Sequence, residues 1–332
     1  MELNLSEIRE EINEIDREMI ELFKRRMACA SSVAEYKAEH NLPVFDPERE
    51  RALLTKICNM AGEELDTYAL TLYNTMLDVS KAYQHKILNS ESHIYNQIKA
   101  SLNSTKKEFP ARARVACQGV EGAYSQIAAT KLFSLPDISF YKTFENVFEA
   151  IENGECDYGV LPIENSTAGS VKKVYELMLS HNFNIVRSVR LKIDHNLLVN
   201  QGVSLDEITE IISHEQAISQ CAGFLANHPN IKVTVCQNTA MAAKLVKESG
   251  RRDLAAISSR ACGELYSLIN IAPSIQDSGN NHTRFICISK NPEVYPGADK
   301  ITLMLVTKNR PGELYRALSC FNALGIDMTK LE

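Results

Sequence analysis

The chain has 332 residues, with 36 lysines and arginines against 42 aspartates and glutamates. This length suffices for two or three domains, and mild acidity without a Lys/Arg-rich run argues against nucleic acid as a partner. Nine cysteines without a CxxC pair indicate free thiols in a reducing compartment rather than a zinc site.

The first hundred residues predict three helices. The acidic N-terminus leads into amphipathic rather than continuous apolar sequence, which resembles neither a signal peptide nor a membrane span, so we expect a cytoplasmic protein. Apolar residues recur every three or four positions over 5–37, which predicts one long helix. Pro47, with Asp46 as N-cap, suits the start of a second helix, and 65–98 predicts a third. Three extended helices without a strand cannot form a globular hydrophobic core by themselves, so we expect this unit to dimerise.

After Pro110 short apolar runs alternate with helical segments, which predicts an α/β architecture with parallel strands and ligands at their carboxyl ends. The strand candidates are 114–117, 158–163, 185–189, 196–199, 210–213, 232–236, 254–258 and 285–289. The helix candidates are 124–133, 143–153, 170–181, 215–227, 239–249 and 259–268.

The last stretch predicts a strand over 301–307, a turn at Pro311-Gly312 and a helix over 313–324. One strand and one helix bury no core, so we expect this third domain to be incomplete. The expected domains are 1–100 helical, 101–111 linker, 112–292 α/β and 299–332 a partial α+β domain.

Cations on the first helix suggest an anion pocket. Arg26 and Lys37 are eleven residues apart, which puts them roughly 20° apart on one face. Arg26 falls on the apolar packing stripe, where a cation is unfavourable unless an anion or acidic partner meets it. Arg9 lies seventeen residues, roughly 25 Å, before Arg26, so for both to serve one small ligand Arg9 must come from a second chain. Taken alone, each cation is better explained as a surface residue in a helix salt bridge, and only the position of Arg26 on the packing stripe departs from that explanation.

These positions resemble the all-helical chorismate mutase domain, in which a dimer forms each site from both chains. The matching residues are Arg9, Arg26, Lys37, Asp46, Arg49, Glu50, Ser80 and Gln84. The resemblance implies that the three arginines bind the carboxylates of chorismate, that Lys37 and Gln84 face its ether oxygen, and that Asp46, Glu50 and Ser80 hold the ring hydroxyl or brace neighbours. A Claisen rearrangement needs no proton transfer, so fixed cations and amide donors suffice.

Three polar segments mark strand ends in the α/β region: 119–125, 157–171 and 276–285. Each alone reads equally well as a turn, a helix cap or a hydrated loop. Together with Ser213-His214, Gln220-Cys221 and Thr283-Arg284-Phe285, they resemble prephenate dehydratase from about residue 112 to 290. That family implies two α/β lobes around a cleft, like a periplasmic binding protein.

Prephenate becomes phenylpyruvate by losing carbon dioxide and hydroxide, so the enzyme must supply a proton or a strong hydrogen bond to the departing hydroxide. The resemblance implies that Thr283 is this donor, polarised by Asn165, Ser213 and Gln220. Ser166 is expected at the substrate and Arg284 at its carboxylate or as a brace. His214 and His282 are expected to satisfy local backbone.

Residues 300–332 resemble the first half of an ACT domain, the amino-acid-binding module through which phenylalanine inhibits this family. Because the sequence stops before the second effector motif, we expect phenylalanine control to belong to a longer parent.

The two resemblances therefore imply a bifunctional enzyme that needs no cofactor or metal, acts on chorismate and prephenate, and forms a homodimer or higher oligomer. Two alternatives remain open: a dehydratase whose helical domain only dimerises, and a two-lobed small-molecule sensor. Arg26 on the packing stripe argues against the sensor.

Overall fold

The computed structural model describes residues 4–88, 93–307, 309 and 312–331. The chain forms two compact units, Met1–Lys99 with Met304–Glu332, and Ala100–Leu303.

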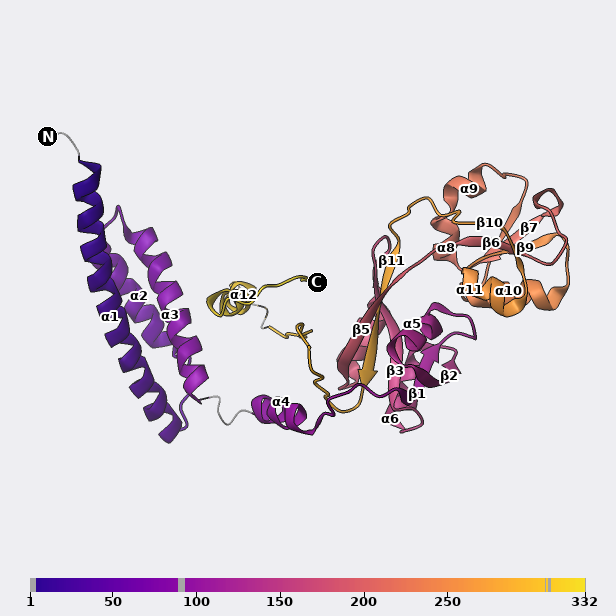
Figure 1. Cartoon of the computed structure of the whole chain (residues 1–332). Helices are drawn as coiled ribbons and strands as arrows, with labels where there is room; N and C mark the ends of the chain where they lie inside the picture. The colour runs from indigo at the N-terminus through magenta and orange to yellow at the C-terminus, as the bar shows by residue number, and fades with distance from the viewer. Residues whose placement is uncertain (1–3, 89–92, 308, 310–311, 332) are drawn as a thin grey trace. The chain divides into compact units, whose positions relative to one another are not determined.

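The first unit is built on α1 (Leu5–Glu39), α2 (Pro47–Ala61) and α3 (Asp66–Leu88), which Figure 1 shows as long helices lying alongside one another. The predicted start of α2 is confirmed, because the Asp46 side chain accepts a hydrogen bond from the Arg49 backbone N–H at 3.0 Å and Pro47 occupies the first turn. Gly62 ends α2 at a φ of 77°, a conformation that favours glycine.

The predicted third helix is two helices, α3 and α4 (His93–Ser104), and residues 89–92 between them lie outside the described part of the chain. The linker predicted over 101–111 is wrong in its first residues, because 101–104 form the last turn of α4. That turn is closed by Thr105, whose backbone N–H and side-chain hydroxyl both donate to the Ser101 carbonyl, at 2.9 and 2.6 Å.

The N-terminal half of α1 presents apolar side chains to solvent. Ile12 and Ile15 are each 50% exposed, and Met19 is 47% exposed, whereas the buried residues of α1, Ala30 and Ala34, lie in its C-terminal half. Spacings of three and four place the exposed residues on one stripe. Such a stripe indicates a partner surface.

The second unit contains two sheets, which Figure 1 shows as separate groups of strands. The first sheet has the order β2-β1-β3-β11-β5, with β4 paired to β3. Its strands are β1 (Arg112–Gln118), β2 (Leu135–Tyr141), β3 (Tyr158–Asn165), β4 (Gly169–Ser170), β5 (Asn184–Lys192) and β11 (His282–Ser289). It packs against α5 (Tyr124–Leu132), α6 (Phe144–Glu152) and α7 (Lys172–Ser180).

The second sheet has the order β10-β6-β9-β7-β8. Its strands are β6 (Asn196–Val199), β7 (Glu210–Ser213), β8 (Lys232–Val235), β9 (Leu254–Ser258) and β10 (Ile269–Ala272). Its helices are α8 (Glu215–Ser219), α9 (Ala222–Ala226), α10 (Thr239–Ser249) and α11 (Arg260–Tyr266), with a short 3-10 turn, η2, at Leu205–Glu207. The chain enters this lobe after β5 and returns to the first sheet at β11. The α/β region therefore consists of two lobes, each with its own sheet.

The sequence predicts parallel strands, but the structure contains both parallel and antiparallel pairs. In the first sheet β1 runs parallel to β2 and β3, but β11 runs antiparallel to both β3 and β5. The reason is connectivity, since β11 returns from the second lobe and enters the sheet from its opposite end. The carboxyl end of β3 therefore lies beside the amino end of β11.

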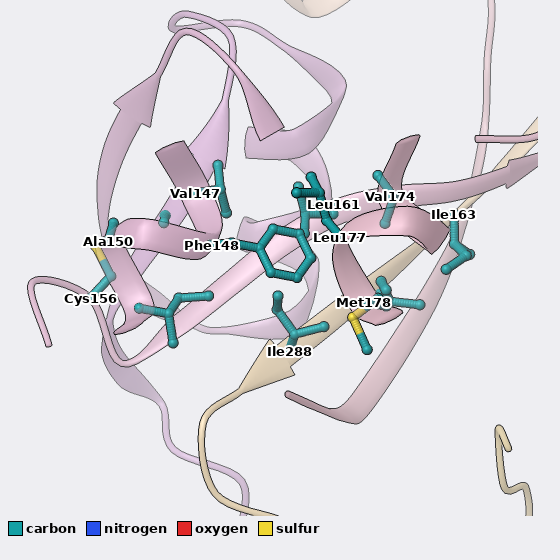
Figure 2. Packing of buried hydrophobic residues seen from close by; sticks show 13 residues of the cluster. Val147, Phe148, Ala150, Cys156, Leu161, Ile163, Val174, Leu177, Met178 and Ile288 are labelled. Atoms are coloured by element: carbon teal, nitrogen blue, oxygen red, sulfur yellow. The ribbon is translucent and has the colours of Figure 1, made fainter. Parts of the chain in front are cut away.

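Figure 2 shows the core between the first sheet and α6 and α7, with Phe148 surrounded by Val147, Leu161, Leu177 and Ile288. Phe148, Val147, Leu161 and Ile288 are fully buried.

Glycine at position 159 lets α6 approach β3 closely. A Cβ at Gly159 would lie 2.7 Å from Ile151 Cδ1 and 3.0 Å from Val147 Cγ1. Since both neighbours are buried in the core, any larger residue at this position would force their side chains to shift.

Other predictions also differ from the structure. Strands β2, β4 and β10 were not predicted, and because β4 takes up Gly169–Ser170, the helix predicted over 170–181 begins at Lys172 as α7. Strand β2 is an edge strand that contains Pro136, which an edge tolerates. The helix predicted over 215–227 is broken, because the Gln220 carbonyl accepts a hydrogen bond from Asp277 N–H at 2.8 Å rather than continuing the helix. Residues 301–307 form no strand, since no neighbouring strand pairs with them, whereas the last predicted helix is confirmed as α12 (Glu313–Ala323). Pro311 of the predicted turn lies outside the described residues.

No helix within the described residues is long and apolar enough to cross a bilayer.

Candidate active sites

The antiparallel pairing of β3 and β11 places Thr283 directly opposite Asn165. The Asn165 side-chain amide donates to the Thr283 hydroxyl oxygen at 2.8 Å. Thr283 is 8% exposed, so this hydroxyl lies in a largely water-excluded position.

The backbone that follows β3 orients the Asn165 amide. Its oxygen, Oδ1, accepts from the backbone N–H of Thr167 at 3.0 Å and of Ala168 at 2.9 Å. Two backbone donors on the oxygen leave the amide nitrogen to face Thr283 and Asn281, whose Oδ1 it reaches at 2.8 Å.

The Thr283 hydroxyl is poised to donate. Its oxygen already accepts from Asn165, and no acceptor for its hydrogen is present among the residues that the structure describes. A hydroxyl with its oxygen engaged and its hydrogen free offers that hydrogen to a bound ligand, and accepting a hydrogen bond makes it a better donor.

Gln220, at the end of α8 in the second lobe, joins this cluster. Its side-chain nitrogen donates to the Thr167 hydroxyl at 2.7 Å, and its side-chain oxygen accepts from Asn281 at 2.9 Å. The Thr167 hydroxyl in turn donates to Asn165 Oδ1 at 2.7 Å. Residues from both lobes therefore form one hydrogen-bonded network that ends at Thr283.

Three members of the network were missed from the sequence: Thr167, Asn281 and His195. His195 is 3% exposed, with Nε2 lying 2.9 Å from the Gln220 side-chain oxygen. Thr167 and Asn281 lie inside polar segments that were singled out. For His195 no sequence signal was available, because it is one polar residue between two strands.

The other predicted dehydratase residues have different surroundings. The Ser166 hydroxyl donates to the Asn280 carbonyl at 2.8 Å and accepts from His282 N–H at 2.9 Å, so it links the two polar loops. Ser213 is fully buried and donates its hydroxyl hydrogen to the Ile257 carbonyl at 2.7 Å, so it does not polarise Thr283 as we expected.

Arg284 lies next to Thr283 on β11 and has its Nε 3.4 Å from a Glu164 carboxylate oxygen. That N–H makes no hydrogen bond with good geometry, so the pair is held by charge alone. His214 caps α8 by accepting from Gln216 N–H, as expected for a histidine that satisfies local backbone. The same expectation is wrong for Nδ1 of His282, which is buried without a hydrogen-bond partner among the described residues.

In the helical unit, the packing of α1 against α3 brings Arg26 next to Ser80, and the Arg26 guanidinium donates a hydrogen bond to the Ser80 hydroxyl oxygen. Ser80 is 4% exposed and Gln84, one turn further on, is 8% exposed. The Gln84 side-chain oxygen is buried and has no hydrogen-bond partner among the described residues. A buried polar atom without a partner is rare in folded proteins and is typical of a ligand site.

Lys37 lies at the end of α1, where its ammonium donates to the Val44 carbonyl at 2.7 Å. That carbonyl lies in the loop between α1 and α2, two residues before Asp46. The loop therefore holds the Lys37 ammonium near the N-terminal end of α2, where Asp46 and Glu50 lie.

Lys81 was not predicted, yet it organises the acidic side of this pocket. Its ammonium lies 3.0 Å from both Glu50 and Asp78, and 5.4 Å above the centre of the Phe45 ring. All three charged side chains are less than one fifth exposed. An ion pair so shielded from water is less screened than a surface pair.

Arg9 and Arg49 are exposed, and the structure does not bring Arg9 to Arg26 within one chain. On a helix that rises about 1.5 Å per residue, the two lie about 25 Å apart. In the described part of the chain, no group of three or more His, Cys, Asp or Glu residues is arranged to hold a metal ion.

The chain matches two family models in sequence. Residues 8–85 match chorismate mutase type II, and residues 115–293 match prephenate dehydratase. The first range contains Arg9 through Gln84, and the second contains Asn165 through Arg284.

Several relatives match nearly the whole chain. A bifunctional chorismate mutase/prephenate dehydratase from Aquifex aeolicus is 31% identical over 330 residues, which cover 99% of this chain and 84% of the relative. A protein of the same description from Enterobacter agglomerans is 32% identical, covering 98% and 83%. The structure of a prephenate dehydratase from Arthrobacter aurescens in complex with L-Phe has the same fold, with a TM-score of 0.58, 24% identity, and coverage of 66% of this chain and 75% of that one. This chain belongs to the family of bifunctional chorismate mutase/prephenate dehydratases.

Proposed function

We propose that this chain converts chorismate to prephenate in its helical unit and prephenate to phenylpyruvate in its two-lobed unit. The observation that carries the second step is the Thr283 hydroxyl, with its oxygen held by Asn165 and its hydrogen free to donate. Both family matches support the pair of activities.

The dehydratase step needs a donor more than a base. Carbon dioxide leaves from one ring carbon as the carbon–carbon bond electrons move into the forming aromatic ring, and hydroxide leaves from the opposite carbon. Thr283 stabilises the departing hydroxide by donating to it, and the Asn165 amide supplies the compensating bond to the threonine oxygen. Arg284, held only loosely by Glu164, is placed to bind a carboxylate of the substrate.

The mutase step uses fixed charges and amide groups. We assign Arg26 and Arg49 to the carboxylates of chorismate, and Lys37 and Gln84 to its ether oxygen. An ether oxygen only accepts, so Gln84 serves it with its amide nitrogen; turning the amide about its last bond puts that nitrogen at the buried position where the amide oxygen has no partner among the described residues. Asp46 and Ser80 brace this pocket.

Glu50 takes the ring hydroxyl, and its ion pair with Lys81 orients its carboxylate.

We further propose that each mutase site is shared between two copies of the chain. No described residue of the same chain covers the apolar stripe on the N-terminal half of α1, and an isologous contact through this stripe would cover it. The same contact brings Arg9 of the second copy toward the pocket that Arg26 and Ser80 form.

Residues 299–332 we assign to an ACT module, for which phenylalanine is the effector to test. Residues 301–307 pair with no strand, and Ile301 and Val306 are 84% and 93% exposed, so we expect no tight binding of phenylalanine by these 332 residues. Isothermal titration with phenylalanine checks this; a submicromolar complex would contradict it.

The two activities are tested by supplying chorismate to the purified chain and following prephenate and phenylpyruvate separately. We expect prephenate to appear first and phenylpyruvate after it, and supplied prephenate to give phenylpyruvate directly. A chain that consumes prephenate without forming phenylpyruvate would contradict the dehydratase assignment.

A further inference from the structure

His195 is a buried polar residue for which the proposed chemistry gives no role. It lies between β5 and β6, where the chain enters the second lobe, and is 3% exposed. One ring nitrogen, Nε2, contacts the Gln220 side-chain oxygen at 2.9 Å, while the other, Nδ1, is buried without a hydrogen-bond partner among the described residues.

A chain of hydrogen bonds leads from the backbone of Thr167 and Ala168 to the His195 ring, and the donor and acceptor of each bond can be assigned. The backbone N–H groups of Thr167 and Ala168 require the Asn165 oxygen to face them, so the Asn165 nitrogen faces Asn281. The Asn281 oxygen must then accept, and its nitrogen donates to Gln220. The Gln220 atom that faces Asn281 and His195 is therefore the amide oxygen.

An amide oxygen only accepts, so His195 must donate from Nε2. Burial lowers the pKa of the His195 imidazole, and the hydrogen bond with Gln220 and the neighbouring Asp194 carboxylate only partly oppose this effect. A neutral ring with its proton on Nε2 has a bare lone pair on Nδ1. The fold thus retains an unsatisfied buried acceptor, which is unfavourable for stability.

We propose that His195 is a positioning residue of the dehydratase site, whose Nε2–H holds the Gln220 amide so that Gln220, Thr167 and Asn165 orient the Thr283 hydroxyl. This inference rests on the proposed dehydratase function. It also links the lobes, because the entry segment of the second lobe then supports a donor on the first sheet.

His195 is not itself the proton donor to the leaving hydroxide. Its protonated nitrogen is occupied by Gln220, and its other nitrogen carries no proton and is inaccessible. The two roles can be separated by substitution, because a positioning residue needs only a neutral donor at the place of Nε2, whereas an acid needs an ionisable ring.

The test compares His195→Gln, which keeps an N–H donor, with His195→Leu, which keeps the volume without a donor. For His195→Leu we expect kcat for phenylpyruvate formation to fall about tenfold, the effect of about one hydrogen bond, with KM changed less than twofold. His195→Gln should restore most of kcat. Mutase turnover in the same polypeptide should stay at the wild-type rate and serves as an internal control.

Thermal unfolding provides the second readout. Because His195→Leu removes the unpaired acceptor, its melting temperature should equal or exceed that of the wild type while kcat falls. A purely structural histidine would lower the melting temperature and kcat together, which would overturn the inference.

Two further outcomes would also overturn it: full dehydratase activity of His195→Leu, or equal loss in the Leu and Gln variants. The proposed function is checked separately with Thr283→Ala. If Thr283→Ala is inactive and His195→Leu fully active, the positioning role alone fails. If the wild type forms no phenylpyruvate, the dehydratase assignment fails.

Discussion

At the scale of single residues, the hydroxyl of Thr283 must act as a donor although a threonine is a weak acid. The structure compensates by giving its oxygen a hydrogen bond from Asn165 and by keeping it 8% exposed. Thr283→Ser should therefore retain measurable dehydratase activity, whereas Thr283→Val, which preserves the shape, should lose about 10²- to 10⁴-fold in kcat.

Steady-state kinetics with prephenate as substrate measure this pair. Since Thr283→Val leaves the Asn165 nitrogen with Asn281 as its remaining partner, circular dichroism should confirm an unchanged fold. Equal kcat values for the two variants would show that the hydroxyl is not the donor.

Lys81 gives a residue-scale prediction for the mutase. Lys81→Met should lower kcat/KM for chorismate at least tenfold, because Glu50 and Asp78 lose the cation between them and repel each other. Lys86→Met, an exposed lysine on the same helix, is the matched control. If both variants behave like the wild type, Glu50 does not depend on Lys81 for its position.

At the scale of elements, the packing of α6 on β3 depends on glycine at position 159. Gly159→Ala should destabilise the second unit by about 1–3 kcal/mol, because the new methyl group would overlap Ile151 and Val147. Gly279→Ala, where a Cβ would meet nothing within 4 Å, is the control. Urea unfolding measures both, and equal midpoints would show that the core has room at this position.

Local signals predicted several elements well. Asp46 and Pro47 specify the start of α2 through chemistry within a few residues, and Asn196–Val199 and Leu254–Ser258 are buried strands with the predicted bounds.

The strand directions and the strand predicted over 301–307 depend on distant partners, which no local pattern reveals. Likewise, Gln220 leaves the helix because Asp277, far along the chain, supplies a donor. Thr283 and Asn165 could be predicted because they lie in motifs that resemble a known family. The roles of His195 and Lys81 could not, because they depend on contacts with Gln220 and Glu50, which are distant in the sequence.

At the scale of the whole molecule, the shared mutase site makes one activity depend on association. Ile15→Asp puts a charge on the exposed apolar stripe of α1 and should give a monomer that lacks mutase activity and keeps dehydratase activity. Arg17→Gln alters net charge equally, on roughly the opposite face of the helix, and should leave association unchanged. Sedimentation velocity with both assays checks this; a fully active monomer would show that Arg9 acts within its own chain or not at all.

The central claim is that the chain carries two separate active sites, and two variants supplied with chorismate test it most directly. With Thr283→Ala, prephenate should accumulate at the wild-type rate without phenylpyruvate. With Gln84→Ala, chorismate should remain unconverted while added prephenate still gives phenylpyruvate. Loss of both activities in either folded variant would contradict two separate sites.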